Sequence, residues 1–196
     1  MILAIIPARG GSKRLSQKNI RQVGGETLIE RAILAAQGSQ YIDNIILSSD
    51  KPGWKVFADR HEIEFDLRPS ELAEDDSPIE DCVTRILRRQ SKRPGIYDLV
   101  ILLQPTSPLR TTEDIDRAIE IFWHPPQRLI SFCDNKKNGA IYITRSIDLL
   151  WGESFSDSQG AQIFLMPPER SIDIDTEEDL RKAEALFKSE TQGITD

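Results

Sequence analysis

Short, fully apolar runs alternate with helical patterns from one end of this chain to the other, and this alternation restricts the fold more than any other feature. Three of the runs are Ile2–Ile6, Ile45–Leu47 and Leu99–Leu103, which contain only apolar residues. Such runs are typical of strands that are buried on both faces of a parallel sheet. Two further strands are predicted at Leu129–Cys133 and Ala140–Thr144.

The segments between and after these runs have apolar side chains every three or four residues, as on one face of an amphipathic helix. This spacing predicts helices over 26–37, 78–90, 113–122 and 176–187, and Pro52 fits the first turn of a further helical segment. Strands that alternate with helices form a mostly parallel sheet covered by helices on both faces. We therefore expect an α/β fold whose ligand site lies beyond the carboxyl ends of the strands.

The size and composition of the chain fit one domain and exclude several classes of protein. Its 196 residues are expected to form a single domain over 1–188, followed by a frayed tail over 189–196. A net charge of −7 is unlike that of a nucleic-acid-binding protein. No apolar run approaches the roughly 18 residues of a membrane span, and the N-terminus does not resemble a signal peptide. We expect a cytoplasmic protein with no membrane or nucleic-acid partner.

The cysteine and basic residues indicate which kinds of ligand site the chain can have. Cys82 and Cys133 are far apart and belong to no CxxC pattern, so neither a disulfide framework nor a zinc site is expected. Residues 1–25 contain five basic side chains and no acidic one, although the whole chain is acidic. A small positive region on an acidic protein suits a compact anion such as a phosphate group.

The loop after the first strand carries most of this positive charge. Gly10 and Gly11 allow a tight turn whose N–H groups can point at a ligand, and Arg9, Lys13 and Lys18 surround them. The loop has neither the spacing of a Walker A sequence nor that of a GxGxxG fingerprint. A solvated basic loop would have the same composition. The position of the loop directly after the first strand favours a phosphate site.

A second candidate segment follows the strand Leu99–Leu103. Gln104 is the first polar residue after five apolar ones, so we expect its side chain at the mouth of the cleft. Thr106 and Ser107, between two prolines, are expected only to make local turn bonds.

The third candidate segment precedes the last predicted helix. Side chains alternate in an extended segment, so Asp173 and Asp175 are expected to point to one side and share a divalent cation with phosphate oxygens. A helix cap by Asp175 or Thr176 is the alternative, but it leaves Asp173 without a role.

These segments together resemble one family. The sequences IPARGGSKRLSQKN, LRPSELAED, LLQPTSPLR, NGAIYIT and SIDIDTEEDL, in this order, are similar to those of the CMP-sialic acid synthetases (acylneuraminate cytidylyltransferases), a family that includes the enzymes for legionaminic and pseudaminic acids. The resemblance covers essentially the whole chain. It implies a Rossmann-like nucleotidyltransferase fold and transfer of CMP from CTP to a nine-carbon acidic sugar, with magnesium as cofactor and pyrophosphate as the second product.

The resemblance also implies roles for individual residues. It assigns nucleotide binding to Arg9, Gly10, Gly11, Ser12, Lys13, Lys18, Asn19, Arg68 and, more weakly, Ser77. Of these, Asn19 and Arg68 match the positions that contact cytidine, and Arg9, Ser12, Lys13 and Lys18 match those that hold the triphosphate. It places Gln104 at the sugar and Asp173 and Asp175 at the metal. It assigns catalytic roles to Arg9, Lys18 and Asp173. The two histidines, His61 and His124, lie outside every shared segment. Ser77 is also explained as the cap of a helix that begins at Pro78.

One departure from the family concerns the segment between the last two predicted strands. Only Asp134–Lys137 connects them, where most relatives have several dozen residues that pair two subunits and cover the partner's sugar site. We therefore expect a monomer, or a dimer unlike that of the family. Two alternatives stay open: a nucleotide-binding protein whose transferase activity is lost or depends on a partner, and transfer to another acidic sugar such as 3-deoxy-octulosonate.

Overall fold

The structure is a computed structural model that describes every residue except 75, 91–96, 123–127, 156 and 193–196. Its strands are β1 (Ile2–Pro7), β2 (Gln22–Val23), β3 (Glu26–Thr27), β4 (Asn44–Ser49), β5 (Glu64–Leu67), β6 (Leu99–Leu102), β7 (Arg128–Cys133), β8 (Lys136–Arg145) and β9 (Gln162–Leu165). Seven of them form one sheet in the order β5-β4-β1-β6-β8-β7-β9, and β2 pairs with β3 separately. Neighbours in the large sheet are parallel except β8, which is antiparallel to β6 and β7. The predicted mostly parallel α/β fold is confirmed.

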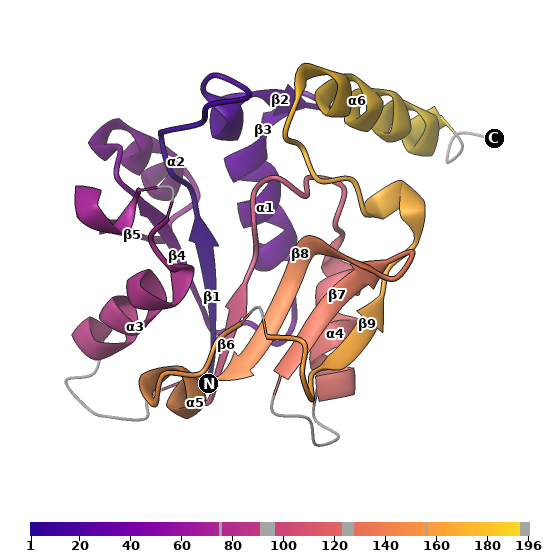
Figure 1. Cartoon of the computed structure of the whole chain (residues 1–196). Helices are drawn as coiled ribbons and strands as arrows, with labels where there is room; N and C mark the ends of the chain where they lie inside the picture. The colour runs from indigo at the N-terminus through magenta and orange to yellow at the C-terminus, as the bar shows by residue number, and fades with distance from the viewer. Residues whose placement is uncertain (75, 91–96, 123–127, 156, 193–196) are drawn as a thin grey trace.

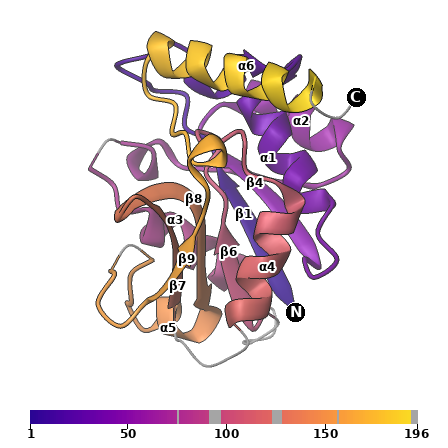
Figure 2. The same ribbon diagram turned by 90° about the vertical axis from the view of Figure 1, so that its right-hand side faces the viewer.

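Helices cover both faces of this sheet. They are α1 (Leu28–Gln37), α2 (Lys55–Arg60), α3 (Ile79–Gln90), α4 (Thr112–Phe122), α5 (Ser146–Leu150) and α6 (Glu177–Gln192), with short 3₁₀ turns at Lys18–Ile20, Pro52–Trp54, Ser70–Leu72 and Pro168–Arg170. Figure 2 shows α1 and α4 on one side of the sheet and α3 and α5 on the other. Each side has its own apolar core, because β-strand side chains alternate between the faces.

The last helix lies outside these two layers. Figure 1 shows α6 across the end of the sheet toward which β1 points. Leu180 and Ala183 of α6 pack there with Val23 of β2 and with Leu15 and Leu109 from loops at the same end. This third cluster holds the start of α6 against the carboxyl ends of the parallel strands, where the candidate site was expected. None of the helices in the described part of the chain has the length and apolar character needed to cross a membrane.

The boundaries of the four predicted helices need correction, by one residue at the starts of α3, α4 and α6 and by more at two other positions. The helix expected from Glu26 begins at Leu28, because Thr27 pairs in β3 and then caps α1 in a capping box with Glu30. The helix expected to end at Phe187 continues to Gln192, so part of the predicted tail is helical. The remainder of that tail, 193–196, and His124 lie outside the described residues.

The sequence patterns did not predict β5 and β9. These two strands form the edges of the sheet, and each has exposed as well as buried residues. Strands that are covered only in part do not give a continuous apolar run, which was the signal used for the central strands.

Candidate active site

A cavity of about 440 Å³ opens at the carboxyl ends of β1 and β6, where ligands bind in folds of this class. Five separate segments of the chain contribute predicted site residues to its lining. These residues are Arg9, Lys18, Asn19, Arg68, Ser77, Gln104, Asp173 and Asp175. The fold therefore brings most of the predicted nucleotide, sugar and metal residues together in one place.

Cations and carboxylates face each other across this cavity. Lys18 Nζ lies 2.9 Å from Asp175 Oδ1, and Arg14 Nη2 lies 2.8 Å from Asp175 Oδ2. The side chain of Lys18 is mostly buried, whereas that of Arg14 is exposed. Arg14 also lines the cavity, although the sequence analysis assigned it no role. The sequence signal that could have identified Arg14 is that it is one of the five basic residues within 1–25.

The loop between Arg9 and Lys18 is held by its own polar groups. The buried side chain of Asn19 donates a hydrogen bond from Nδ2 to the carbonyl of Arg9, at 2.9 Å. Arg9 donates from Nη1 to the carbonyl of Glu74 on the opposite wall, at 3.4 Å. Asn19 thus closes the base of the loop, so that Arg9 and Lys18 lie at the same cavity.

The expected glycine cradle is wrong at Gly10. The N–H of Gly10 donates to Asp50 Oδ1 at 2.7 Å, at the end of the neighbouring strand β4, instead of pointing into the cavity. A Cβ at this position would overlap the side chain of Lys51, which is exposed and flexible and would have to move aside. Gly11, Ser12 and Lys13 likewise do not line this cavity, and Gly11 and Lys13 are exposed.

The two predicted metal-binding carboxylates lie in different surroundings at the same cavity. The side chain of Asp173 lines the cavity, and partial desolvation there raises its pKa above the usual range. The nearby charge of Asp175 also raises the pKa of Asp173, whereas a hydrogen bond from Thr106 and the charge of Lys18 lower it. Asp175 forms the ion pairs with Lys18 and Arg14 described above. The sequence therefore placed both side chains on one side of the segment correctly, but their electrostatic environments differ.

The start of α6 leaves Asp175 available for the cavity. Thr176 caps the helix, since its Oγ1 accepts from the N–H of Asp179 at 3.2 Å. Asp179 Oδ2 in turn accepts from the N–H of Thr176 at 2.9 Å. Of the two predicted caps, Thr176 is thus the one in place, and the Asp175 side chain points to the cations instead.

The donor set fits a hard divalent cation that shares its ligands with a nucleotide. Asp173 and Asp175 supply carboxylate oxygens, the ligands that Mg²⁺ prefers. In the described residues, no group of three or more His, Cys, Asp and Glu side chains is placed to hold a metal. Two carboxylates with phosphate oxygens and water as the remaining ligands match the usual form of a Mg²⁺–nucleotide site.

Arg68 and Ser77 line the wall formed by β5 and α3. Arg68 is buried and bonded to Ser48 at the end of β4. Ser77 donates from Oγ to the carbonyl of Glu71 at 2.6 Å, which ties the start of α3 to the preceding loop. α3 begins at Ile79, one residue after the predicted Pro78.

Gln104 also lines this cavity, and it lies against the start of β8. A Cβ on Gly139 would lie 2.9 Å from Gln104 Oε1, and Gly139 has φ +74°. The buried Arg110 donates from Nη1 to the carbonyls of Gln104, at 3.2 Å, and Ala140, at 2.7 Å. Desolvation lowers the pKa of Arg110 to about 10, so the group remains charged at neutral pH. Arg110, which the sequence analysis did not single out, therefore holds the Gln104 loop to β8.

The expectation that Thr106 and Ser107 make only local turn bonds is wrong. Thr106 lines the cavity, and its side chain hydrogen-bonds to Asp173. Ser107 donates from Oγ to the carbonyl of Asn138 at 3.2 Å. Both hydroxyls therefore connect the Gln104 loop to other segments that border the site.

The connection between β7 and β8 is even shorter than the sequence indicated. Lys136 and Lys137 already belong to β8, so only Asp134 and Asn135 form the turn. Both have positive φ values, 48° and 63°, as in a type I′ hairpin. The structure thus has a tight hairpin where an inserted arm would begin.

Comparison with known proteins tests the family to which these features point. A family model described as "Cytidylyltransferase" matches residues 3–139, from β1 to the beginning of β8. The chain belongs to the cytidylyltransferase family. The match includes the cation loop, Arg68 and Gln104, whereas Asp173 and Asp175 follow it in sequence.

Relatives with named activities resemble this cytidylyltransferase along its whole length. It is 30% identical to the CMP-N,N'-diacetyllegionaminic acid synthase of Legionella pneumophila, over 98% of this chain and 99% of that one. It is 29% identical to the pseudaminic acid cytidylyltransferase of Campylobacter jejuni, over 95% and 96%. The alignment with the Legionella protein spans 229 positions, so that protein has residues that this shorter chain lacks. The predicted family is confirmed.

The same fold occurs in solved structures of more distant proteins. The structure titled CMP:2-keto-3-deoxy-manno-octonic acid synthetase complexed with CTP superposes with a TM-score of 0.72 over 96% of this chain and 99% of that one. At 16% identity, this similarity concerns the fold alone.

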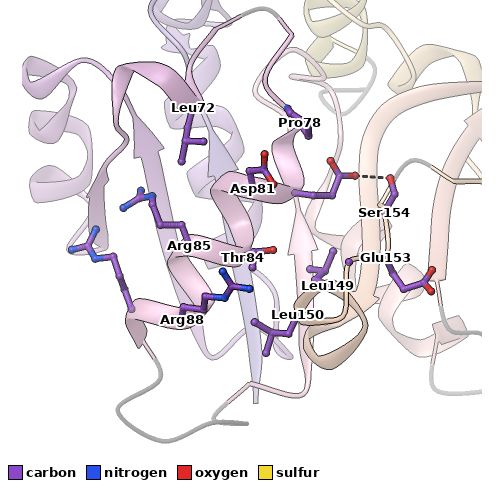
Figure 3. A pocket seen from close by; sticks show the side chains of 13 residues that line it. Leu72, Pro78, Asp81, Thr84, Arg85, Arg88, Leu149, Leu150, Glu153 and Ser154 are labelled. Atoms are coloured by element: carbon purple, nitrogen blue, oxygen red, sulfur yellow. Dashed lines mark hydrogen bonds between the residues drawn. The ribbon is translucent and has the colours of Figure 1, made fainter.

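A larger cavity of about 870 Å³ lies on the other side of α3 in this cytidylyltransferase (Figure 3). It lies between α3 and the segment after α5, and its lining combines leucines with both basic and acidic side chains. Of the residues that line the candidate active site, it shares only Leu72. The smaller cavity remains the candidate active site, because the predicted basic side chains and the two predicted carboxylates converge on it and not on the larger one.

Proposed function

We propose that this cytidylyltransferase activates an acidic nine-carbon sugar of the nonulosonic type, with CTP as the donor and CMP-sugar and pyrophosphate as products. The observation that carries the proposal is the convergence of Arg9, Lys18, Asp173 and Asp175 on one cavity at the carboxyl ends of the strands. Two relatives support this substrate class by their names. One is a CMP-N,N'-diacetyllegionaminic acid synthase, and the other is a pseudaminic acid cytidylyltransferase.

In the proposed reaction, the anomeric hydroxyl oxygen of the sugar forms a bond to the α-phosphorus of CTP. The bond from that phosphorus to the pyrophosphate oxygen breaks, and the hydroxyl proton leaves to solvent. Negative charge grows on the phosphate oxygens, so Arg9 and Lys18 stabilise both the transition state and the leaving group. No side chain has to act as a nucleophile.

The remaining site residues have supporting roles in this proposal. Asn19 and Arg68 contact the cytidine, and Gln104 contacts the sugar. Asp173 and Asp175 would hold Mg²⁺, which supplies charge neutralisation at the phosphates when it is bound. Arg14 joins the phosphate cations because it pairs with Asp175 at the cavity. Ser12 and Lys13 would reach the triphosphate only from outside the cavity lining.

The short hairpin bears on the assembly of the enzyme. A turn of two residues, Asp134 and Asn135, has no arm that could reach a second subunit. We therefore propose that the protein is a monomer, or a dimer that forms through a face other than the β7–β8 hairpin. Light scattering at micromolar concentration checks it: a stable dimer whose interface is the β7–β8 hairpin would contradict it.

The direct test is turnover with defined substrates. Purified protein is incubated with CTP, Mg²⁺ and a panel of legionaminic, pseudaminic, sialic and 3-deoxy-octulosonic acids, and pyrophosphate release is followed. Reactions without sugar, without metal, and with UTP in place of CTP are the controls. Release that depends on a nine-carbon acid supports the proposal. Release only with the eight-carbon acid, or CTP binding without turnover on any sugar, would contradict it.

A further inference from the structure

The side chain of Arg68 is held by hydrogen bonds to Ser48. Its Nε lies 3.3 Å from Ser48 Oγ, and its Nη2 lies 3.1 Å from the Ser48 carbonyl oxygen. Both residues are buried, and Arg68 lines the active-site cavity while Ser48 does not. Ser48 therefore fixes one edge of the guanidinium group and leaves the rest of it to the cavity.

The hydroxyl group of Ser48 is itself oriented by a carboxylate. Ser48 Oγ lies 2.8 Å from Asp66 Oδ2, and the two residues are paired across the parallel strands β4 and β5. A hydroxyl group has one proton, and a carboxylate only accepts hydrogen bonds. Because this proton goes to Asp66, Ser48 Oγ must act as the acceptor toward Arg68. The thiol of Cys82, at 3.3 Å, is then a further donor to the same oxygen.

The charge of Asp66 is balanced from the other side. Arg85 and Arg89 of α3 both form ion pairs with its carboxylate. Figure 3 shows Arg85 extending from α3 on the side away from Leu149 and Leu150. In the described residues, the hydrogen-bond partners of the Arg68 side chain are neutral oxygens of Ser48. The positive charge of Arg68 is thus oriented by Asp66 through Ser48 but is not neutralised by it.

We propose that Ser48 and Asp66 are positioning residues that orient the Arg68 guanidinium for recognition of the cytosine base, an inference that rests on the proposed function. A guanidinium group presents only donors. The edge of cytosine has two adjacent acceptors, O2 and N3, whereas uracil carries a hydrogen on N3. A guanidinium held in one orientation therefore favours CTP over UTP, and a loosely held one loses part of this preference.

The test compares two buried serines on the same strand. For Ser48→Ala, the KM for CTP is expected to rise about tenfold, with a similar fall in the ratio of kcat/KM for CTP over UTP, since one hydrogen bond to a charged group is lost. The KM for the sugar should stay within about twofold, because the substitution is far from Gln104. Ser49→Ala removes the same atom from the next residue, which is equally buried, and should leave all three values unchanged.

A double-mutant cycle separates a positioning role from a general structural one. If Ser48 acts through Arg68, Ser48→Ala should add nothing to the CTP KM of Arg68→Ala. Asp66→Asn keeps the size of the side chain, and it should reduce the CTP preference in the same direction as Ser48→Ala. An unchanged CTP/UTP ratio in Ser48→Ala, with a large loss in Arg68→Ala, would overturn the positioning role and leave the proposed function intact. Normal CTP kinetics in Arg68→Ala would overturn both this inference and the proposed place of the nucleotide.

Discussion

The two parts of the candidate active site that are proposed to bind the nucleotide and the sugar are built in different ways. The part proposed for the nucleotide phosphates, called here the nucleotide end, consists of charged side chains, and two of its cations pair with Asp175; its residues are Arg9, Arg14, Lys18, Asp173 and Asp175. The part proposed for the sugar, around Gln104, is called the acceptor end. At the acceptor end, Gln104 is held by bonds from the buried Arg110 and Ser107 to backbone carbonyls and by contact with Gly139. At the nucleotide end, a charged ligand can replace Asp175 as the ion-pair partner of Lys18 and Arg14. At the acceptor end, packing fixes the shape. Substitutions should therefore act through charge at one end and through shape at the other.

The largest effect is expected for Asp173→Asn at the nucleotide end. Turnover should fall by about 100-fold or more, because even the outer partners of a metal site are worth about 10- to 100-fold. The measurement is kcat at saturating CTP, sugar and Mg²⁺. Asp59→Asn, an exposed carboxylate that pairs with Lys55 on α2, is the control and should retain normal turnover. Near-normal metal-dependent turnover of Asp173→Asn would mean that the segment before α6 has only a structural role.

The next effect concerns the buried cation that pairs with Asp175. Lys18→Ala should lower kcat/KM for CTP by about 10- to 100-fold, the size of one charge-assisted hydrogen bond. The KM for the sugar should change by less than about threefold, since Lys18 pairs with Asp175 and not with Gln104. Lys55→Ala removes an exposed lysine that pairs with Asp59, and it serves as the control. Equal losses for both substrates in Lys18→Ala would break the division of the cavity into two ends.

A change of shape at the acceptor end should have a smaller effect, and it should affect the sugar rather than CTP. Gly139→Ala places a Cβ 2.9 Å from Gln104 Oε1, so Gln104 must move. The KM for the sugar should rise about tenfold while the KM for CTP stays the same, because a shift of one contact costs about 1 to 2 kcal/mol.

The control for this substitution has the same backbone strain. Gly160 has φ +75°, close to the +74° of Gly139, but a Cβ there would meet no atom within 4 Å. Gly160→Ala should therefore lower the thermal midpoint without changing either KM. If both variants raise the KM for the sugar equally, backbone strain rather than contact with Gln104 is the cause.

The smallest effect concerns stability and has a defined pH dependence. Burial raises the pKa of Asp173, so the folded protein binds this proton more tightly than the unfolded chain. Ionised Asp173 therefore reduces stability as pH rises from the ordinary carboxyl pKa through the raised one. Asp173→Asn should have a higher thermal midpoint than the wild type at neutral pH, and the difference should shrink as pH falls below about 4. A difference that is constant with pH, or a loss of stability in Asp173→Asn at neutral pH, would contradict this.

The central part of the fold followed from local sequence patterns. Ile2–Ile6 and Leu99–Leu103 are buried on both faces, so their apolar character alone predicted strands β1 and β6. The edge strands β5 and β9 were missed because partial burial removes that signal. The order of the strands, and the reversal of β8 that brings Gly139 to the carboxyl ends of its neighbours, depend on pairing between distant segments.

The candidate site divides in the same way. The residue types suited to phosphate and metal were visible in the sequence, because a cation-rich loop and an Asp-x-Asp segment are local features. The partners of these residues were not visible: Asp50 takes the N–H of Gly10, Arg14 reaches Asp175, and Arg110 fixes Gln104 from inside the core. The first two contacts join segments that are far apart in the chain, and Arg110, six residues from Gln104, is itself bonded to the distant Ala140. The sequence by itself determined which residue types are available to bind phosphate and metal, whereas only the tertiary structure decided which of them face the cavity, since burial and long-range hydrogen bonds exist only after the chain has folded.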